Sequence, residues 1–214
     1  NSSGDTPLIA AASRGNLESC RLLLKEAASC HTIVEELLMT GNKNGDTPLH
    51  VTISIASQEK STDELVDLLL AHSTERVVNT PNQDGLTPLL VACERDDATL
   101  LQKLMSHKAN LAVDTTTGAS PMAVAAFCGS KDVLAVLLAM IKEASSGNDD
   151  DDALLLLLLE QPNTNGCTPL WLAARSGRPK VVEMLLQAGA DPTVKNKDGI
   201  SPTDIAIKHK REKV

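Results

Sequence analysis

Short apolar stripes alternate with polar turns along this 214-residue chain. In the clearest unit, Thr168-Pro169 opens a short apolar stretch that ends at Gly177. Threonine suits a helix N-cap, proline the first helical position, and glycine the left-handed residue beyond a helix end. A second stripe follows, with apolar residues spaced i, i+1, i+4 and i+5 as on one helix face: Val181, Val182, Leu185 and Leu186. The pattern predicts two helices joined by a short loop.

This unit restarts along the whole chain, each time with a glycine two residues before a Thr-Pro or Ser-Pro pair. The two shortest intervals are 33 residues (120 − 87 and 201 − 168), and the other intervals are longer, so those repeats carry insertions. A repeated supersecondary unit of this length is typical of a solenoid. The restarts are Thr6, Thr47, Thr87, Ser120, Thr168 and Ser201.

The repeat resembles the ankyrin repeat, which is a turn and two antiparallel helices in 33 residues with a Thr-Pro-Leu-His start. Thr47-Pro48-Leu49-His50 reproduces that start. The resemblance implies an all-α solenoid of stacked helix-turn-helix units, forming one domain over residues 1–214. Its repeats would begin near residues 1, 42, 82, 115, 163 and 196. The last repeat lacks its second helix, so we expect the chain to be a fragment of a longer protein.

Three repeats are lengthened. Residues 29–39 are expected to hold an extra helix, opened by a capping box from Thr32 to Glu35. In the second repeat the loop is longer, and Thr62 or Asp63 would cap a helix over 64–71. In the fourth, residues 145–152 form an acidic loop that we expect to be mobile, and the leucines of 154–159 a short helix. That tract is too short to span a bilayer, and the aspartate spacing does not match a calcium loop.

Composition narrows the class of protein. The net charge of −8 argues against a nucleic-acid surface. Five cysteines are an odd number, and their spacing fits no metal site, so we expect free thiols in the cytoplasm or nucleus. We also expect no cofactor, no metal, no direct membrane insertion and a monomer. The sequence contains no phosphate-binding glycine loop, zinc-protease motif or nucleophile elbow. An enzyme is therefore not expected, although a catalytic domain elsewhere in a longer protein is compatible with the pattern.

In the ankyrin family, partners contact the turn tips and the ends of the first helices, on the concave face. The resemblance therefore implies a scaffold or adaptor that binds a protein or peptide there. The alternatives are a regulatory or substrate-targeting segment of a larger enzyme or effector, and a purely structural spacer. Carried onto this chain, the partner-binding positions are Arg14, Asp46, Leu86, Glu94, Arg95, Phe127, Cys128 and Arg175.

The two aromatic residues of the chain, Phe127 and Trp171, have two interpretations each. Phe127 is either an exposed anchor or packed beneath the insertion of the fourth repeat, whereas Trp171, in the histidine slot, is expected to wedge between the fourth and fifth repeats. His50 would hydrogen-bond between neighbouring turns, by the same resemblance. We further predict that Phe127, Arg95 and Arg175 occupy matching positions and form one row. Such a row suits an acidic-aromatic or apolar peptide.

Overall fold

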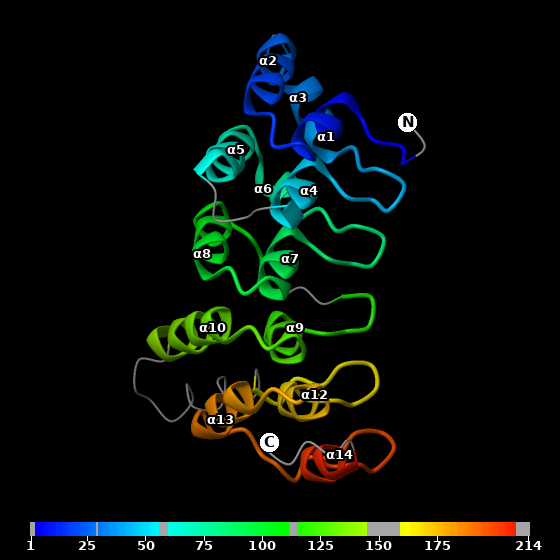
Figure 1. Ribbon diagram of the computed structural model, residues 1–214, viewed down its shortest axis with the longest axis vertical. Helices are drawn as coiled ribbons and strands as arrows, with labels where there is room; N and C mark the ends of the chain where they lie inside the picture. The colour runs from blue at the N-terminus through cyan, green and yellow to red at the C-terminus, as the bar shows by residue number, and fades with distance from the viewer. Residues whose placement is uncertain (1–2, 29, 56–59, 112–114, 145–158, 209–214) are drawn as a thin grey trace. The chain divides into compact units, whose positions relative to one another are not determined.

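The computed structural model describes residues 3–28, 30–55, 60–111, 115–144 and 159–208 (Figure 1). In these ranges every regular element is a helix and no strand occurs, which confirms the all-α class. The chain divides into two compact units. Unit 1 comprises residues 1–91 and 102–110, and unit 2 comprises residues 92–101 and 111–214. The single domain expected from the sequence stays a prediction.

The first helix of each repeat begins at the predicted Thr-Pro or Ser-Pro pair. Thr168 Oγ1 accepts a hydrogen bond from Trp171 N at 3.3 Å, and Ser120 Oγ accepts one from Ala123 N at 3.3 Å. These bonds satisfy backbone donors that have no partner inside the helix, and the proline that follows has no N–H to leave unpaired. The first helices are α1 (Pro7–Ala12), α4 (Pro48–Ile55), α7 (Pro88–Glu94), α9 (Pro121–Cys128), α12 (Pro169–Ser176) and α14 (Pro202–Lys208).

In the first, third, fourth and fifth repeats, a residue with positive φ separates the two helices. Gly129 has φ 87° and Gly177 has φ 65°, and in the third repeat Asp96 takes the same conformation with φ 58°. Aspartate tolerates this left-handed region better than most residues. The second helices are α2 (Leu17–Ala27), α5 (Lys60–Ala71), α8 (Ala98–Ser106), α10 (Lys131–Ala144) and α13 (Pro179–Gln187).

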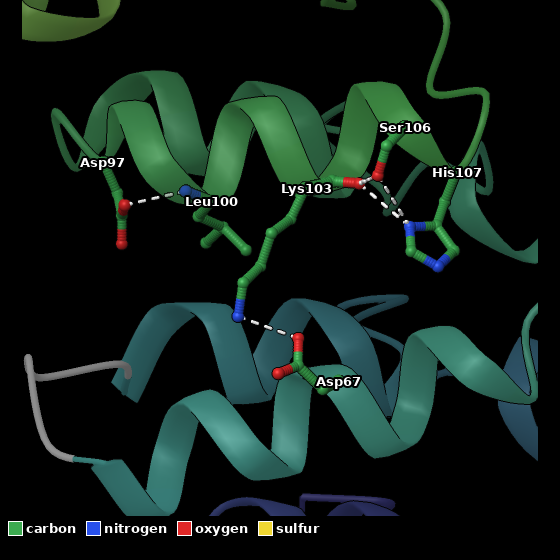
Figure 2. A network of polar contacts seen from close by, with 6 residues as sticks. All are labelled: Asp67, Asp97, Leu100, Lys103, Ser106 and His107. Carbon is green, nitrogen blue, oxygen red and sulfur yellow. Dashed lines mark hydrogen bonds and ion pairs between the residues drawn. The ribbon is translucent and has the colours of Figure 1, made fainter.

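In unit 1, helices of the same kind stack on one another. The first helices α1 and α4 are in contact, and so are the second helices α2 and α5. The expected extra helix is α3 (His31–Met39), which contacts α2, α4 and α6 (Glu75–Val78). Figure 2 shows the tie from α8 to α5, where Lys103 Nζ lies 2.8 Å from Asp67 Oδ1. Because this ion pair is largely exposed, it contributes at most about 1 kcal/mol.

In unit 2, α12 lies between α9 and α14 and also contacts its own second helix, α13. The second helices α10 and α13 are in contact as well. Ala125 of α9 and Ala173 of α12 are 0% exposed. Small side chains at these two positions let neighbouring helices approach closely.

Two local predictions were wrong, and one short helix was missed. Thr32 and Glu35 do not form a capping box, because α3 begins earlier, at His31, and the Glu35 carboxylate accepts a hydrogen bond from Thr74 Oγ1 at 2.9 Å. The helix expected over 64–71 begins at Lys60, so Thr62 is a buried residue within it and not its cap. The short helix α6 was not predicted. Its N-cap is Thr74, whose hydroxyl accepts from Val77 N at 3.4 Å.

The acidic stretch and most of the leucine tract that follows it, residues 145–158, lie outside the described residues, and so do residues 57–59 of the lengthened loop. The last leucine of the tract, Leu159, is among the described residues, and its side chain is 0% exposed. The preceding second helix, α10, extends to Ala144.

Candidate functional site

Asparagine side chains build the turn tips that precede the first helices. Asn82 Oδ1 accepts hydrogen bonds from Asp84 N at 3.0 Å and from Leu86 N at 2.9 Å. The glycine three residues further on, Gly85, has φ 77°, a conformation that glycine adopts without a steric penalty. The same bonds recur at Asn42, Asn163 and Asn196. An asparagine placed in this way fixes the loop without any contact from a helix.

Neighbouring tips in each unit are tied through their backbones. In unit 1, Gln83 N donates to Asn44 O at 2.9 Å, and in unit 2 Lys197 N donates to Asn165 O at 3.1 Å. A side-chain bond adds to the first of these ties, because Asn82 Nδ2 donates to Asp46 Oδ1 at 2.8 Å. Asp46, a predicted partner-binding residue, is half-buried, and its carboxylate already accepts this hydrogen bond within the chain.

His50 is a structural residue, as the sequence predicted. Its Nε2 lies 2.8 Å from Leu86 O, and its Nδ1 lies 2.8 Å from Thr47 Oγ1. The carbonyl can only accept, so Nε2 carries the proton. Burial lowers the pKa of His50 below its usual value, although the Leu86 carbonyl and the Asp46 carboxylate act in the opposite direction. Leu86, another predicted site residue, thus uses its carbonyl to join two turns.

Trp171 takes over this role in the fifth repeat. Its side chain is 5% exposed, and its Nε1 donates to Ile200 O at 3.1 Å. Ile200 precedes Ser201 as Leu86 precedes Thr87, so the two bonds are equivalent. Burial of the indole is confirmed. Its N–H, however, bonds to the sixth repeat, whereas we had expected the side chain to wedge between the fourth and fifth repeats. The guanidinium carbon of Arg175 lies 5.7 Å from the centroid of the Trp171 ring.

Phe127 lies in the last turn of α9, one residue before the helix ends, and is 49% exposed, so the structure shows the exposed alternative. Arg178 Nε donates to the Phe127 carbonyl at 3.3 Å. A Cβ built on Gly129 would lie only 2.6 Å from Arg178 Cδ, so the arginine side chain crosses directly over this glycine. The guanidinium group of Arg178 is thereby held against the backbone of the residue that carries the exposed phenyl ring.

The residues of positive φ define which positions correspond. Phe127 lies two residues before Gly129, as Arg175 lies two before Gly177 and Glu94 two before Asp96. Phe127 therefore corresponds to Glu94 and Arg175. The predicted row is wrong by one residue, because Arg95 corresponds instead to the half-buried Cys128. Glu94, Arg95 and Arg175 are all exposed.

Asp96 has a second role beyond its backbone conformation. Its Oδ1 accepts hydrogen bonds from Asp132 N at 2.8 Å and from Val133 N at 3.0 Å, both in the first turn of α10. The carboxylate of one repeat thus caps the second helix of the next, where the helix dipole favours negative charge. In the fourth repeat, the residue that corresponds to Asp96 is Gly129, which has no side chain with which to cap the next second helix, α13. The N-cap of α13 is Arg178, whose side chain makes no capping bond.

Comparison with family models identifies the repeat. The model described as ankyrin repeats in three copies matches residues 1–54 and 53–147, and the model for a single ankyrin repeat matches residues 165–197. This chain belongs to the ankyrin-repeat family. Ankyrin repeats are in general modules of protein–protein interaction, with extended surfaces for partners.

The relatives of this ankyrin-repeat chain are longer proteins of different kinds. The human transient receptor potential cation channel subfamily A member 1 is 28% identical over 194 residues, which are 90% of this chain and 16% of the channel. The tyrosine-protein kinase HTK16 of Hydra vulgaris is 28% identical over 79% of this chain and 20% of its own length. The probable E3 ubiquitin-protein ligase XBOS32 of Oryza sativa subsp. japonica is 29% identical over 86% and 38%, respectively. The chain spans less than two fifths of each of these relatives.

The ankyrin architecture separates the predicted site residues into two units. Arg14, Asp46 and Leu86 belong to unit 1, and the remaining five residues belong to unit 2. Arg14 is exposed and lines an open hollow of about 400 Å³ between α1 and α2. In unit 2 the structure brings Phe127 next to Arg178, which sequence reasoning missed. The available signal was Gly129, which leaves room for a long side chain from the next repeat.

The described ranges contain neither a metal-ion cluster nor a membrane-spanning helix. No group of three or more histidine, cysteine, aspartate or glutamate side chains there could hold a metal ion. No helix in the same ranges is long and apolar enough to cross a membrane.

Acid should destabilise this ankyrin fold through His50. The pKa of His50 is lowered in the folded chain, so the unfolded chain binds the proton first as the pH falls. The contribution of His50 to stability is therefore complete above about pH 6.5 and is lost as the pH falls from there through the folded-state pKa. Urea unfolding followed by circular dichroism at about pH 8 and pH 5 should show a smaller pH effect in His50→Gln than in the parent chain. An equal pH effect in both would assign the loss to other groups.

Proposed function

We propose that this chain is a protein-binding module that holds a protein or peptide partner against the turn tips and the ends of its first helices. The observation that carries this proposal is Phe127, whose aromatic side chain is 49% exposed near the end of α9 and whose backbone carbonyl accepts a hydrogen bond from Arg178 of the next repeat. Aromatic and arginine side chains dominate the binding energy of protein interfaces. In this proposal the chain carries out no chemistry of its own.

The cellular setting is part of the same proposal. Cys20, Cys93 and Cys167 are buried as free thiols. Free thiols are usual in the reducing cytoplasm and nucleus. The proposal accordingly places the partner in one of these compartments, as the sequence led us to expect.

A comparative pull-down tests the binding function. The parent chain and Phe127→Ala should be used as baits side by side, and the captured proteins quantified by mass spectrometry. The matched control is Leu186→Ala, because Leu186 is 43% exposed on α13 but lies at neither a turn tip nor a first-helix end. A partner bound at the proposed surface should lose about 1–3 kcal/mol of binding free energy with Phe127→Ala and little with Leu186→Ala.

Circular dichroism of the same samples should show equal helicity in all three chains, because neither side chain belongs to the core. If every captured protein is retained equally by Phe127→Ala, the binding surface lies elsewhere on the chain. A loss of folding in Phe127→Ala would contradict its assignment as an exposed anchor.

A second candidate is a regulatory or substrate-targeting segment of a larger enzyme or effector. It is favoured by the relatives, which include a tyrosine-protein kinase and a probable E3 ubiquitin-protein ligase; the region that they share with this chain is 20% and 38% of their respective lengths. The two candidates differ in what the bound protein is. If the bound protein is a target of the full-length protein's own activity, the second candidate is favoured. If the chain links two unrelated proteins, the scaffold is favoured.

A further inference from the structure

Three cationic side chains gather where α12 ends and α13 begins. Arg175 is in the last turn of α12, Arg178 is the N-cap of α13, and Lys180 is in the first turn of α13. All three are exposed, and within the described part of the chain none of them forms an ion pair. This accumulation of positive charge contrasts with the net charge of −8 for the whole chain.

One of these cations, Arg178, contacts the backbone of Phe127. Arg178 crosses over Gly129 and donates from Nε to the Phe127 carbonyl at 3.3 Å. The remaining N–H groups of its guanidinium have no hydrogen-bond partner among the described residues. The surface thus combines apolar area from the phenyl ring with several unused N–H donors. We call Phe127, Arg175, Arg178 and Lys180 the α12–α13 patch.

The start of α10, in the fourth repeat, shows which chemical group is complementary to the start of a second helix. At the start of α10, the Asp96 carboxylate accepts from two backbone N–H groups of the first turn, at 2.8 and 3.0 Å. At the start of α13, the residue that corresponds to Asp96 is Gly129. The chain therefore supplies a carboxylate to α10 from within itself, whereas at α13 it supplies cations and no carboxylate.

We propose that the α12–α13 patch binds an acidic segment of a partner protein that also carries a large apolar side chain. Carboxylates of that segment pair with Arg178, Arg175 and Lys180, where charge-assisted bonds to guanidinium groups are strong. Its apolar side chain packs on Phe127. This inference rests on the proposed function, because it gives the chemistry of the partner at the same surface.

Trp171 provides a direct readout of binding. It is the only tryptophan of the chain, and Arg175 lies over its ring, so a carboxylate that engages Arg175 should change its fluorescence. The probe is the acetylated and amidated peptide Glu-Asp-Leu-Phe-Glu-Asp, titrated into the chain of residues 1–214 at low ionic strength. One control peptide replaces the acids with Gln and Asn, and another replaces Leu-Phe with Gly-Gly.

The expected result is saturable binding of the acidic peptide, weakened about tenfold by Arg178→Glu and by either change in the peptide. Binding should also weaken with added salt, because the charges are exposed. Equal binding of the neutral peptide, or of the acidic peptide by Arg178→Glu, would overturn the proposal.

A pair of substitutions at Gly129 makes the test sharper. Gly129→Asp places a carboxylate where the third repeat has Asp96, so it should occupy the cations and weaken the acidic peptide about tenfold. Gly129→Ala must adopt the same positive φ as Gly129→Asp and displaces the same flexible arginine side chain, but it adds no charge. It should weaken the peptide clearly less than Gly129→Asp does. An equal effect of the two variants, at equal helicity, would contradict the role of charge.

The outcomes separate this inference from the proposed function. If the peptide does not bind, but a captured partner still depends on Phe127, the partner chemistry is wrong and the binding function stands. If the peptide binds as expected while no captured protein depends on Phe127, the patch recognises acidic segments but the proposed function loses its support.

Discussion

Replacing Trp171 with alanine should lower the free energy of unfolding by about 3–5 kcal/mol, the range for large aromatic side chains removed from a core. The indole is 5% exposed, so its loss leaves a cavity where α12 faces the sixth repeat. The bond from Nε1 to Ile200 O, at 3.1 Å, is lost as well. Urea unfolding should be followed by circular dichroism, because the variant removes the only tryptophan of the chain.

Two further substitutions separate the two contributions of Trp171. Trp171→His installs the residue that the second repeat uses, and its Nε2 can donate to Ile200 O as His50 does to Leu86 O. Trp171→Phe keeps an aromatic ring but has no donor. We expect both to be more stable than Trp171→Ala, and the histidine to restore the hydrogen bond. A loss below about 1 kcal/mol in Trp171→Ala would show that the indole is not part of the packed core.

Replacing Ala173 with leucine should lower the free energy of unfolding by about 1–3 kcal/mol, because it adds methylene groups where no space exists. Ala173 is 0% exposed, and its helix α12 contacts α9, α13 and α14. The larger side chain must therefore push neighbouring helices apart or adopt an unfavourable rotamer. The thermal midpoint should fall accordingly.

The matched control for this overpacking is Gln187→Leu. Gln187 is exposed at the end of α13, so the same leucine side chain there meets no packed neighbour and should leave the midpoint nearly unchanged. A midpoint in Ala173→Leu equal to that of the parent would contradict the close approach of the helices assigned to unit 2.

Local structure was determined by the sequence to a large extent. The pairs Thr168-Pro169 and Ser120-Pro121 begin helices because each supplies an N-cap oxygen and a residue without an N–H. The N-cap oxygen bonds to a backbone N–H only three residues further along the chain. Gly177 ends α12 for an equally local reason, the positive φ that glycine tolerates. Even the correct correspondence of Phe127 with Glu94 could have been counted from these punctuating residues.

The contacts between repeats were decided only by the tertiary structure. Glu35 resembled half of a capping box but accepts from Thr74, and Asp96 resembled a loop residue but caps α10. Arg178 reaches Phe127 across 51 positions of the chain. The physical reason is that a sequence pattern records bonds between residues a few positions apart. Which group satisfies an exposed donor or carboxylate depends on what the fold places opposite it, and opposite Arg178 of the α12–α13 patch the fold places Gly129, which has no carboxylate.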